Sequence, residues 1–379
     1  MSRPIRPGSA LGLLGGGQLG RMFTLAARNL GYRVHALDPG HDCPAGQVAD
    51  LEIRAAYNDV YAAQALARGV DAVTVEFENI PAETLEAVAQ VCPMHPGALV
   101  LHTVQHRLRE KRFLASRGFP VTPFREINTQ ADLSDATEAL GLPAALKTAS
   151  FGYDGKGQQK LASPGQVPEA FAALGGQQGV LEAWVPFELE CSVVCARSSA
   201  GETAVWDVAE NAHRHHILDT TVFPARIPAA VAAQAQAMAI AIAGALGVVG
   251  MLTVEFFLKA GGELLVNELA PRPHNSGHAT IDACITSQFE QQVRAVCGLP
   301  LGDTALLRPA AMANLLGDLW PEGGDPAWER LLDHRDVKLH LYGKTEARPG
   351  RKMGHLTALG ASPEEALAKV LAAREALKG

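Results

Sequence analysis

Two glutamates, Glu255 and Glu268, follow a pattern that could hold a divalent cation. Glu255 lies in the apolar run MLTVEFFL (251–258), and Glu268 ends a second apolar run after the Gly261-Gly262 pair. Two apolar runs separated by a glycine pair are typical of a β-hairpin, and a turn centred on these glycines sets the two carboxylates opposite each other. Like charges directly opposite are destabilising, so the pair predicts a hard ion such as Mg2+ between them. The alternative is a solvated hairpin whose acids point to water.

A glycine-rich segment, residues 151–158 (FGYDGKGQ), follows the strand-like run 143–150. Glycines that alternate with polar residues free backbone N–H groups to surround an anion, and Lys147 and Lys156 can place ammonium groups on phosphate oxygens. The spacing differs from that of a Walker loop. The segment therefore predicts a phosphate-binding loop, and a plain hairpin turn is the alternative.

A second glycine motif opens the chain. Gly15, Gly17 and Gly20 follow the first apolar run and precede a helical stretch, and Asp38 ends the next strand. This matches a dinucleotide fingerprint and would make the protein an NAD-dependent dehydrogenase. The glycines alone, however, show only that the backbone turns tightly and that a phosphate-bearing ligand could approach the helix.

Acids and histidines gather at three further points. VEFEN places Glu76 and Glu78 at the carboxyl end of the third predicted strand, the usual ligand edge of a parallel sheet. The turn 271–275 gathers a guanidinium, an imidazole and an amide. A metal site is one interpretation of the histidines His213, His215 and His216, but the cysteines lack metal-ligand spacing, and a loop histidine more often hydrogen-bonds a ligand or water.

Near the C-terminus, Lys344, Arg348, Arg351 and Lys352 gather four positive charges around a Pro-Gly turn. Such a cluster suits a phosphate monoester. A solvated basic hairpin is the alternative, and it predicts little effect when any one charge is removed.

Composition and periodicity indicate the elements that must position these residues. The first hundred residues alternate short apolar strands with helical stretches, as in a parallel α/β layer. The basic stretch 106–118 is typical of an exposed helix. The run 237–254 has 18 residues without a charge, but GALGVVG divides it into a helix over about 229–246 and the strand that carries Glu255.

The charge and the cysteines limit the partners. A net charge of −7 and a pI near 6.0 argue against nucleic acid as the main partner. The six cysteines are scattered, and the polar N-terminus does not resemble a signal peptide. We therefore expect a cytoplasmic protein with no membrane partner.

Together these segments resemble a known family over nearly the whole chain. The chain is similar to the N5-carboxyaminoimidazole ribonucleotide synthetases, ATP-grasp enzymes of purine biosynthesis, in the ordered motifs GGGQLGRM, FGYDGKGQ, EAWVPFELE, NELAPRPHNSGH and YGKTEARPGRKMGHLT. The resemblance implies mixed α/β and α+β structure. It implies a Rossmann-like domain over 1–103, an ATP-grasp region over 104–305 with a lid around 123–185, and a small C-terminal part over 306–379.

The resemblance also implies an activity. Such an enzyme converts 5-aminoimidazole ribonucleotide, ATP and bicarbonate to the N5-carbamate, ADP and phosphate through carboxyphosphate, with Mg2+ as the cofactor, and is a homodimer. A formate-dependent ATP-grasp transformylase would share the carboxylate pair and the glycine loop. A non-catalytic nucleotide-binding module would be expected to lack Glu255, Glu268 or Lys147, and all three are present.

Site residues follow from the matching motifs. The resemblance assigns the nucleotide to Arg107, Lys147, Gly152, Tyr153, Asp154, Gly155, Lys156, Gly157, Gln158, Glu182, Ala183, Trp184, Val185, Glu190, His213, Asn267 and Glu268. It assigns the metal to Glu255 and Glu268, and the ribonucleotide to Gly17, Gln18, Leu19, Glu76, Lys344, Arg351 and Lys352. It assigns bicarbonate and carboxyphosphate to Arg272, His274 and Asn275, with Tyr153 as a further catalytic residue.

Three positions qualify this transfer. In a regular pleat Asn267 points away from Glu268, so both can serve one nucleotide only if the strand bends there. Val75 stands where the family commonly has Tyr, and His106 where it usually has Asp. Neither change removes a charged metal or phosphate ligand, but Val75 could loosen substrate placement near Glu76.

Overall fold

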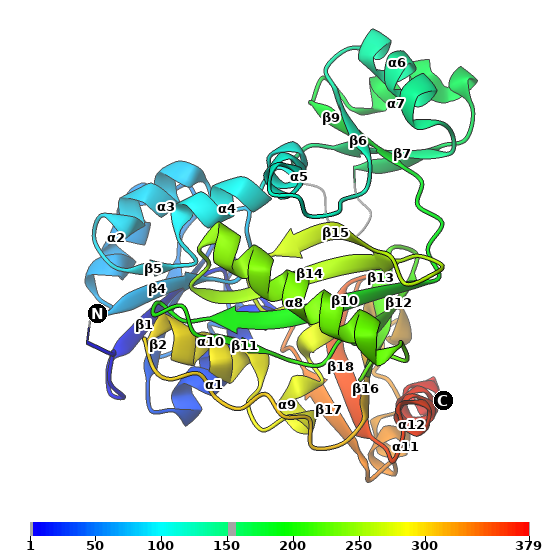
Figure 1. The fold of residues 1–379 in the computed structure, drawn as a ribbon. Helices are drawn as coiled ribbons and strands as arrows, with labels where there is room; N and C mark the ends of the chain where they lie inside the picture. The colour runs from blue at the N-terminus through cyan, green and yellow to red at the C-terminus, as the bar shows by residue number, and fades with distance from the viewer. Residues whose placement is uncertain (1–2, 151–156, 379) are drawn as a thin grey trace.

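The computed structural model describes residues 3–150 and 157–378. Most of the predicted phosphate loop lies outside these ranges, namely Gly152, Tyr153, Asp154, Gly155 and Lys156. The described chain forms an N-terminal α/β domain, a small projecting unit, and a large antiparallel sheet that continues into the C-terminal part (Figure 1).

The N-terminal domain is a five-stranded parallel sheet in the order β3-β2-β1-β4-β5. Its strands are β1 (Ala10–Leu14), β2 (Arg33–Asp38), β3 (Leu51–Arg54), β4 (Ala72–Val75) and β5 (Met94–His95), and its helices are α1 (Gln18–Asn29), α2 (Val60–Arg68), α3 (Ala82–Ala89) and α4 (Ala98–Val104). Leu11 and Leu13 of β1 enter one core with α1, whereas Leu14 enters a second core with α2 and α3. Burial on both faces is typical of parallel strands. The predicted order strand, helix, strand, helix, strand is confirmed, with β3 as an additional short edge strand.

The projecting unit is an antiparallel sheet in the order β6-β9-β7-β8 (Figure 1). It comprises β6 (Phe124–Ile127), α6 (Gln130–Leu140), β7 (Ala144–Thr148), β8 (Gln158–Leu161), the 3-10 turn η1 (Pro164–Gln166), α7 (Val167–Ala173) and β9 (Gly179–Ala183). Leu146 packs with α6 and α7, so its neighbour Lys147 faces the other side of the sheet. Glu182 reaches that same side, because Ala145 is its register partner.

The large sheet has nine strands in the order β15-β14-β10-β12-β13-β16-β18-β17, with β11 beside β10. Its strands are β10 (Leu189–Arg197), β11 (Thr203–Val205), β12 (Ala209–Arg214), β13 (Ile217–Phe223), β14 (Gly250–Leu258), β15 (Leu264–Ala270), β16 (Ala310–Leu316), β17 (Val337–Leu341) and β18 (Lys352–Leu359). The C-terminal part thus shares a sheet with the strands that carry Glu255 and Glu268.

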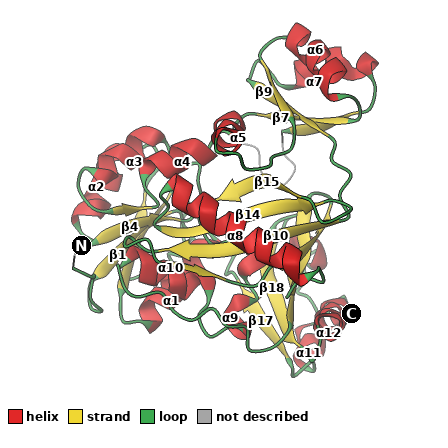
Figure 2. Ribbon diagram, in the orientation of Figure 1, coloured by secondary structure: helices red, strands yellow, loops and turns green. Residues whose placement is uncertain are grey.

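Helices α8 (Ala229–Leu246), α10 (Gln288–Val296) and α12 (Pro363–Ala376) pack on this sheet (Figure 2). The other helical elements of this part of the chain are α5 (Arg107–Ser116), η2 (Asn275–Gly277), α9 (Thr280–Ala283), η3 (Gly317–Leu319) and α11 (Trp328–Leu332). Helix α10 packs against both α1 and β14. It therefore joins the N-terminal domain to the large sheet.

The uncharged run resolves into α8 and β14, as the sequence predicts. By length and composition α8 could cross a membrane, a test that core helices of soluble proteins also pass. In this fold Ala235, Ala239 and Ile242 pack against the large sheet. The helix ends at Gly247 in the left-handed conformation, φ +67°.

The prediction for 106–118 is wrong in one respect. Helix α5 is not simply exposed, because Glu110 and Lys111 retain only 4% and 1% of their accessible surface. Lys111 pairs with Glu182 of the projecting unit, and Glu110 accepts a hydrogen bond from the Leu269 N–H of β15. A run of charges on a helix is usually solvated, but here distant strands supply a carboxylate for Lys111 and a backbone N–H for Glu110.

Candidate active site

The β14–β15 hairpin confirms the predicted register, since Glu255 is the direct partner of Glu268. The next pair is Phe256 with Val266, so Asn267 is an extra residue in a β-bulge. The bulge supplies the bend that Asn267 requires, and Asn267 and Glu268 line the same cavity. The buried Oδ1 of Asn267 accepts no hydrogen bond from any residue that the structure describes.

This cavity, of about 1100 Å³, lies between the projecting unit, the large sheet and the N-terminal domain. It brings together most of the described residues that the sequence assigns to substrates, namely Gln18, Leu19, Glu76, Arg107, Lys147, Gln158, Glu182, Ala183, Trp184, Val185, Glu190, His213, Glu255, Asn267, Glu268, Arg272, His274, Asn275 and Lys352. Of the described candidates, Gly17, Gly157, Lys344 and Arg351 are not among the lining residues.

A buried group of charges forms the wall between the projecting unit and α5. Lys147 Nζ lies 2.8 Å from Glu182 Oε2, and Lys111 Nζ lies 3.2 Å from Glu182 Oε1. Burial alone would raise the pKa of Glu182, but Lys111, Lys147 and Arg107 hold it at about 2. Glu182 therefore stays ionised and fixes both ammonium groups beside the cavity.

Each of the facing carboxylates lies close to a side-chain nitrogen. Glu268 Oε2 lies 3.1 Å from Arg107 Nη1, and Glu255 Oε1 lies 3.1 Å from His274 Nε2. Burial would raise the pKa of Glu255, but the hydrogen bond from His274 and the nearby His213 and Arg272 lower it to about 2. Glu255 can therefore act as an anionic ligand.

These residues fit a Mg2+ ion. Mg2+ is usually bound by one or two carboxylates together with substrate phosphates. Glu255 and Glu268 supply the carboxylates, and the unpaired Oδ1 of Asn267 is a further hard oxygen beside them. Within residues 3–150 and 157–378, no group of three or more His, Cys, Asp or Glu side chains could hold a metal by itself. Substrate oxygens would complete the coordination.

The three neighbouring histidines take different positions. His213 Nδ1 lies 2.7 Å from Glu190 Oε2. Burial would lower the pKa of His213, but the hydrogen bond and charge of Glu190 raise it. His215 and His216 form the turn between β12 and β13 at φ +52° and +64°, and the His216 ring contacts the Gln158 amide at 3.1 Å. The structure gives no support to a metal site formed by these histidines.

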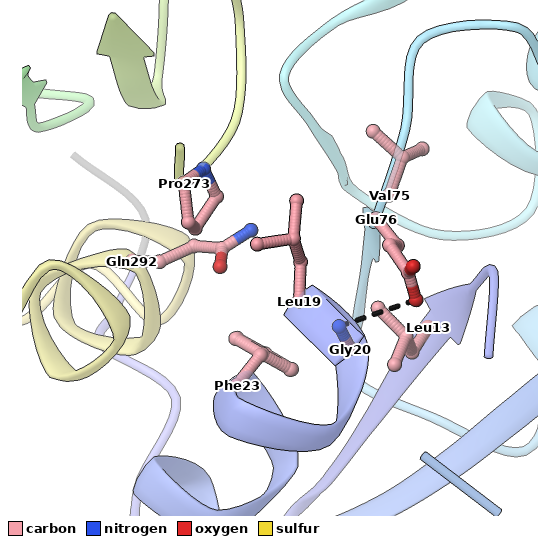
Figure 3. A pocket seen from close by; sticks show the side chains of 8 residues that line it. All are labelled: Leu13, Leu19, Gly20, Phe23, Val75, Glu76, Pro273 and Gln292. Carbon is pink, nitrogen blue, oxygen red and sulfur yellow. Dashed lines mark hydrogen bonds between the residues drawn. The ribbon is translucent and has the colours of Figure 1, made fainter. Parts of the chain in front are cut away.

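Carboxylates of the protein occupy the N-terminal glycine motif. Glu76 Oε2 accepts a hydrogen bond from the Gly20 N–H at 3.2 Å, as Figure 3 shows. A Cβ at Gly17 would meet Glu76 Oε1 at 2.0 Å, so a side chain there would displace the Glu76 carboxylate. Asp38 Oδ2 accepts from the Gly16 N–H at 2.7 Å. The donors that would bind a dinucleotide pyrophosphate are thus engaged internally, which weighs against the dehydrogenase alternative.

Burial raises the pKa of Glu76 to about 7, although the N–H groups of Gly20 and Gly17 oppose the shift. The charge of Asp38 adds to the shift, and that of Lys344 reduces it. The neighbouring Val75 is 1% exposed and packs in the core of the domain, so it offers no polar group at this position. His106 precedes α5, and burial is the main cause that lowers its pKa.

The C-terminal basic segment does not place all its charges in the cavity. Lys352 lines it, whereas Lys344 Nζ donates to the Lys352 carbonyl at 2.6 Å. Arg351 Nη1 donates to the Glu346 carbonyl at 2.7 Å. The Gln47 amide donates to the Gly343 carbonyl at 2.8 Å, which holds this segment against the N-terminal domain.

Several residues of the site are absent from the predicted set. Lys111 escapes notice because the sequence places it in a run of solvated charges. Glu78 is a second such residue: it pairs with Arg272 at 2.6 Å. The VEFEN pattern marks Glu78, but the motif match does not assign it to a substrate. Lys160 lies 4.0 Å from the centre of the Trp184 ring in a cation–π contact. Only the pairing of β7, β8 and β9 brings those two residues together.

Gly157 and Gln158 are the part of the glycine-rich segment that the structure describes. Gly157 has φ +70°, and its carbonyl accepts from the Thr148 N–H at 2.8 Å. A Cβ on Gly157 would meet Thr148 Oγ1 at 2.6 Å. A glycine is therefore required where the segment rejoins β8.

A cavity enclosed between a small antiparallel sheet and a large sheet, with paired lysines on one side and facing carboxylates on the other, defines an ATP-grasp enzyme. The model of the ATP-grasp domain matches residues 112–289. The ribonucleotide synthetase preATP-grasp domain matches 9–105, and the phosphoribosylaminoimidazole carboxylase C-terminal domain matches 310–369.

Curated relatives and solved structures agree. The N5-carboxyaminoimidazole ribonucleotide synthase of Bacillus subtilis is 47% identical over 93% of this chain and 92% of its own. That of Pseudomonas aeruginosa is 43% identical over 92% and 93%. A synthetase solved with ADP has a TM-score of 0.94 at 46% identity over 98% of both chains. The Aspergillus clavatus enzyme solved with ADP and 5-aminoimidazole ribonucleotide has a TM-score of 0.91 at 32% identity, over 97% and 98%.

This chain belongs to the N5-carboxyaminoimidazole ribonucleotide synthase family of ATP-grasp ligases. The predicted family, fold class and enzyme class are confirmed. Membership favours a carboxylating enzyme over the formate-dependent transformylase and the dehydrogenase.

Proposed function

We propose that this chain carboxylates 5-aminoimidazole ribonucleotide to N5-carboxyaminoimidazole ribonucleotide in de novo purine biosynthesis, using ATP and bicarbonate. One cavity carries the proposal, because it runs from the lysines of the projecting unit to Glu76 and the start of α1. Relatives solved with ADP, and with ADP and 5-aminoimidazole ribonucleotide, support two substrates in that space.

In this proposal the nucleotide lies between the projecting unit and the β14–β15 hairpin. Lys147 supplies positive charge to the cavity, Lys111 lies behind it on the shared partner Glu182, and Trp184 and Phe187 offer apolar surface at the same wall. Glu255 and Glu268, with Asn267, would hold Mg2+, which neutralises phosphate charge when bound. Phosphoryl transfer asks mainly for positioning and charge neutralisation, and these residues provide both. The glycine-rich loop 152–158 stays a predicted part of the nucleotide-binding site.

Bicarbonate would bind beside Arg272, His274 and Asn275. The amide of Asn275 is 7% exposed, and neither its nitrogen nor its oxygen is hydrogen-bonded to any described residue. A buried amide without partners costs free energy unless a ligand satisfies it. Its place in the cavity therefore suits a small anion with both donor and acceptor atoms, as bicarbonate has.

The reaction then follows from the chemistry of bicarbonate. A bicarbonate oxygen attacks the γ-phosphorus of ATP, which releases ADP and forms carboxyphosphate. Carboxyphosphate splits into CO2 and phosphate, and the amine of the ribonucleotide captures the CO2 and loses a proton. A closed cavity protects the intermediate from water.

The ribonucleotide would lie against Gln18 and Leu19 near Glu76, with its phosphate reached by Lys352 and by Lys344 and Arg351 after they rearrange. The family resemblance supports a homodimer. The six cysteines are free and buried, which suits a reducing cytoplasm. Light scattering after size-exclusion chromatography would test the dimer.

The deciding experiment measures phosphate release with ATP, Mg2+ and bicarbonate, with and without 5-aminoimidazole ribonucleotide. We expect release that depends on bicarbonate, coupled to carbamate formation when the ribonucleotide is present. Activity with formate in place of bicarbonate would instead identify a transformylase. A change in NADH fluorescence on binding would support the dehydrogenase.

A further inference from the structure

A chain of buried polar side chains leads across the large sheet to His274. Its members are Thr221 of β13, Asn211 of β12, Ser192 of β10 and Ser276 of η2. All four are buried, with exposed fractions of 0%, 6%, 0% and 0%. Thr221 is the register partner of Asn211, and Ser192 is the register partner of Glu255. This chain of side chains therefore starts on β13, three strands away from β14, and ends beside the β14–β15 hairpin.

Consecutive members are hydrogen-bonded in one direction. The Thr221 hydroxyl donates to Asn211 Oδ1 at 3.1 Å, and Asn211 Nδ2 donates to Ser192 Oγ at 2.9 Å. Ser192 Oγ donates to Ser276 Oγ at 2.7 Å, and Ser276 Oγ lies 2.9 Å from His274 Nδ1. Each hydroxyl between the ends accepts one bond and donates the next. A buried network whose members are all satisfied rigidifies its surroundings.

The geometry selects one tautomer of His274. The backbone N–H of Ser276 points at His274 Nδ1 at 3.3 Å, and an amide N–H can only donate. Nδ1 must therefore be an acceptor, so the neutral ring carries its hydrogen on Nε2. That nitrogen lies 3.1 Å from Glu255 Oε1, and His274 lines the cavity.

A second contact fixes the backbone of the same residue. The Gln288 amide is fully buried, and its Oε1 accepts from the His274 N–H at 2.9 Å while its Nε2 donates to the His274 carbonyl at 2.7 Å. The ring and the backbone of His274 are thus held by separate groups. Hydrogen bonds to both the ring and the backbone restrict the orientation of His274 more than packing alone would.

We propose that Thr221, Asn211, Ser192 and Ser276 are positioning residues that hold His274 as an Nε2–H donor beside Glu255. In this role, which rests on the proposed function, the single Nε2–H of His274 orients the Glu255 carboxylate beside the bound bicarbonate, and His274 does not act as a general base. Bicarbonate is already an anion, so its attack on ATP needs orientation and charge stabilisation and no prior loss of a proton. Glu255 gains from the same donor, since second-sphere hydrogen bonds orient carboxylate ligands of metals.

Ser192→Ala tests the chain at its middle, and Thr253→Val is the matched control. Thr253 is a fully buried threonine on β14 whose hydroxyl bonds to no residue that the structure describes. We expect kcat to fall about tenfold in Ser192→Ala, within the range seen for second-sphere partners. The KM for ATP should stay within about twofold, because Ser192 does not line the cavity. Thr253→Val should leave both constants unchanged.

Nitrogen-15 NMR of the histidine side chains supplies a readout that needs no substrate. The His274 signals are assigned by their absence in His274→Gln. Wild type should show the hydrogen on Nε2 alone, whereas Ser192→Ala and Ser276→Ala should show a mixture of tautomers. A hydrogen on Nδ1 in wild type would overturn the proposal, and so would a Ser192→Ala protein that matches Thr253→Val in both tautomer and kcat.

If Ser192→Ala does not fold, the isosteric Thr221→Val takes its place, with the same control and a smaller loss of about threefold expected from its distance. The two proposals fail separately. A wild-type enzyme that forms no carbamate from bicarbonate contradicts the proposed function, whereas the tautomer is measured without turnover and still decides whether the polar chain positions His274.

Discussion

Two partly or fully buried glutamates at opposite ends of the cavity are kept in place by different means. Glu182 lies between Lys111, Lys147 and Arg107, and despite its burial these cations hold its pKa at about 2. Glu76 lies at the start of α1 among backbone N–H groups with Asp38 nearby, and burial raises its pKa to about 7. The end that we propose binds the nucleotide, called the nucleotide end below, therefore keeps a permanent charge, whereas the other end has a carboxyl group that can take up a proton near neutrality.

The difference reflects what each end is expected to bind. ATP brings several negative charges, so its wall must hold lysines whose positions depend on a fixed anion. The N-terminal glycine motif offers only partial positive charge from N–H groups, which Glu76 and Asp38 already occupy. A glycine-rich turn before a helix is therefore not by itself evidence for a bound phosphate.

The largest effect is expected at the facing carboxylates of the nucleotide end. Glu255→Gln and Glu268→Gln should each reduce kcat on the order of a thousandfold, about 4 kcal/mol, because the ion that neutralises phosphate charge loses an anionic ligand. The midpoint of urea unfolding should change little. ADP formation measures the rate, and a wild-type rate at ordinary Mg2+ concentrations would remove the metal assignment.

Glu182→Gln should act on stability. The change leaves Lys111 buried with a neutral partner, and loss of one member of a buried ion pair costs about 3 kcal/mol. Urea unfolding followed by circular dichroism measures it. Glu126→Gln is the control, because its partner Arg112 is 58% exposed and such a pair contributes at most about 1 kcal/mol. Equal losses in the two variants would contradict the buried charge network.

The pH dependence of the same group has a definite sign. The folded pKa of Glu182 lies below the unfolded value of 4.5, so the unfolded chain binds more protons between pH 4.5 and about 2. The stabilisation is fully present above pH 4.5 and is lost as the pH falls through this window. The Glu182→Gln variant should lack that part of the acid transition.

Sequence patterns predicted the elements that are defined by local features, namely the periodicity of apolar residues and the glycines that end each run. The strands and helices of the first domain, the α8–β14 boundary and the Glu255–Glu268 register all follow from apolar runs and glycines. The bulge at Asn267 appears in the sequence only as a conflict between the regular pleat and the expected ligand set. Burial of Lys111 and Glu110 depends on partners more than 70 residues away, the Glu182 carboxylate for Lys111 and the Leu269 N–H for Glu110. No local pattern contains that information.

The basic segment near the C-terminus gives a smaller, selective effect. Lys352 lines the cavity, whereas Arg351 is turned toward Glu346. Lys352→Ala should raise the KM for 5-aminoimidazole ribonucleotide about ten- to a hundredfold, the equivalent of a charge-assisted contact of about 1.5 to 3 kcal/mol. Arg351→Ala should raise it less, and neither should change the KM for ATP. If both substrates weaken equally, the ribonucleotide phosphate binds elsewhere.

The smallest effect is expected at Glu76, and it tests the other side of the comparison. Because the folded pKa of about 7 lies above the unfolded 4.5, the folded protein binds more protons in that window, so stability falls as the pH rises through it. Glu76→Gln cannot ionise and should lack this fall. Relative to wild type, the variant should gain about 1 to 2 kcal/mol in unfolding free energy between pH 5 and pH 8. Unfolding by urea at the two pH values measures the change, with Glu83→Gln on the surface of α3 as the control. A constant difference between Glu76→Gln and wild type would mean that Glu76 is ionised throughout, and that both ends of the cavity hold their carboxylates in the same charge state.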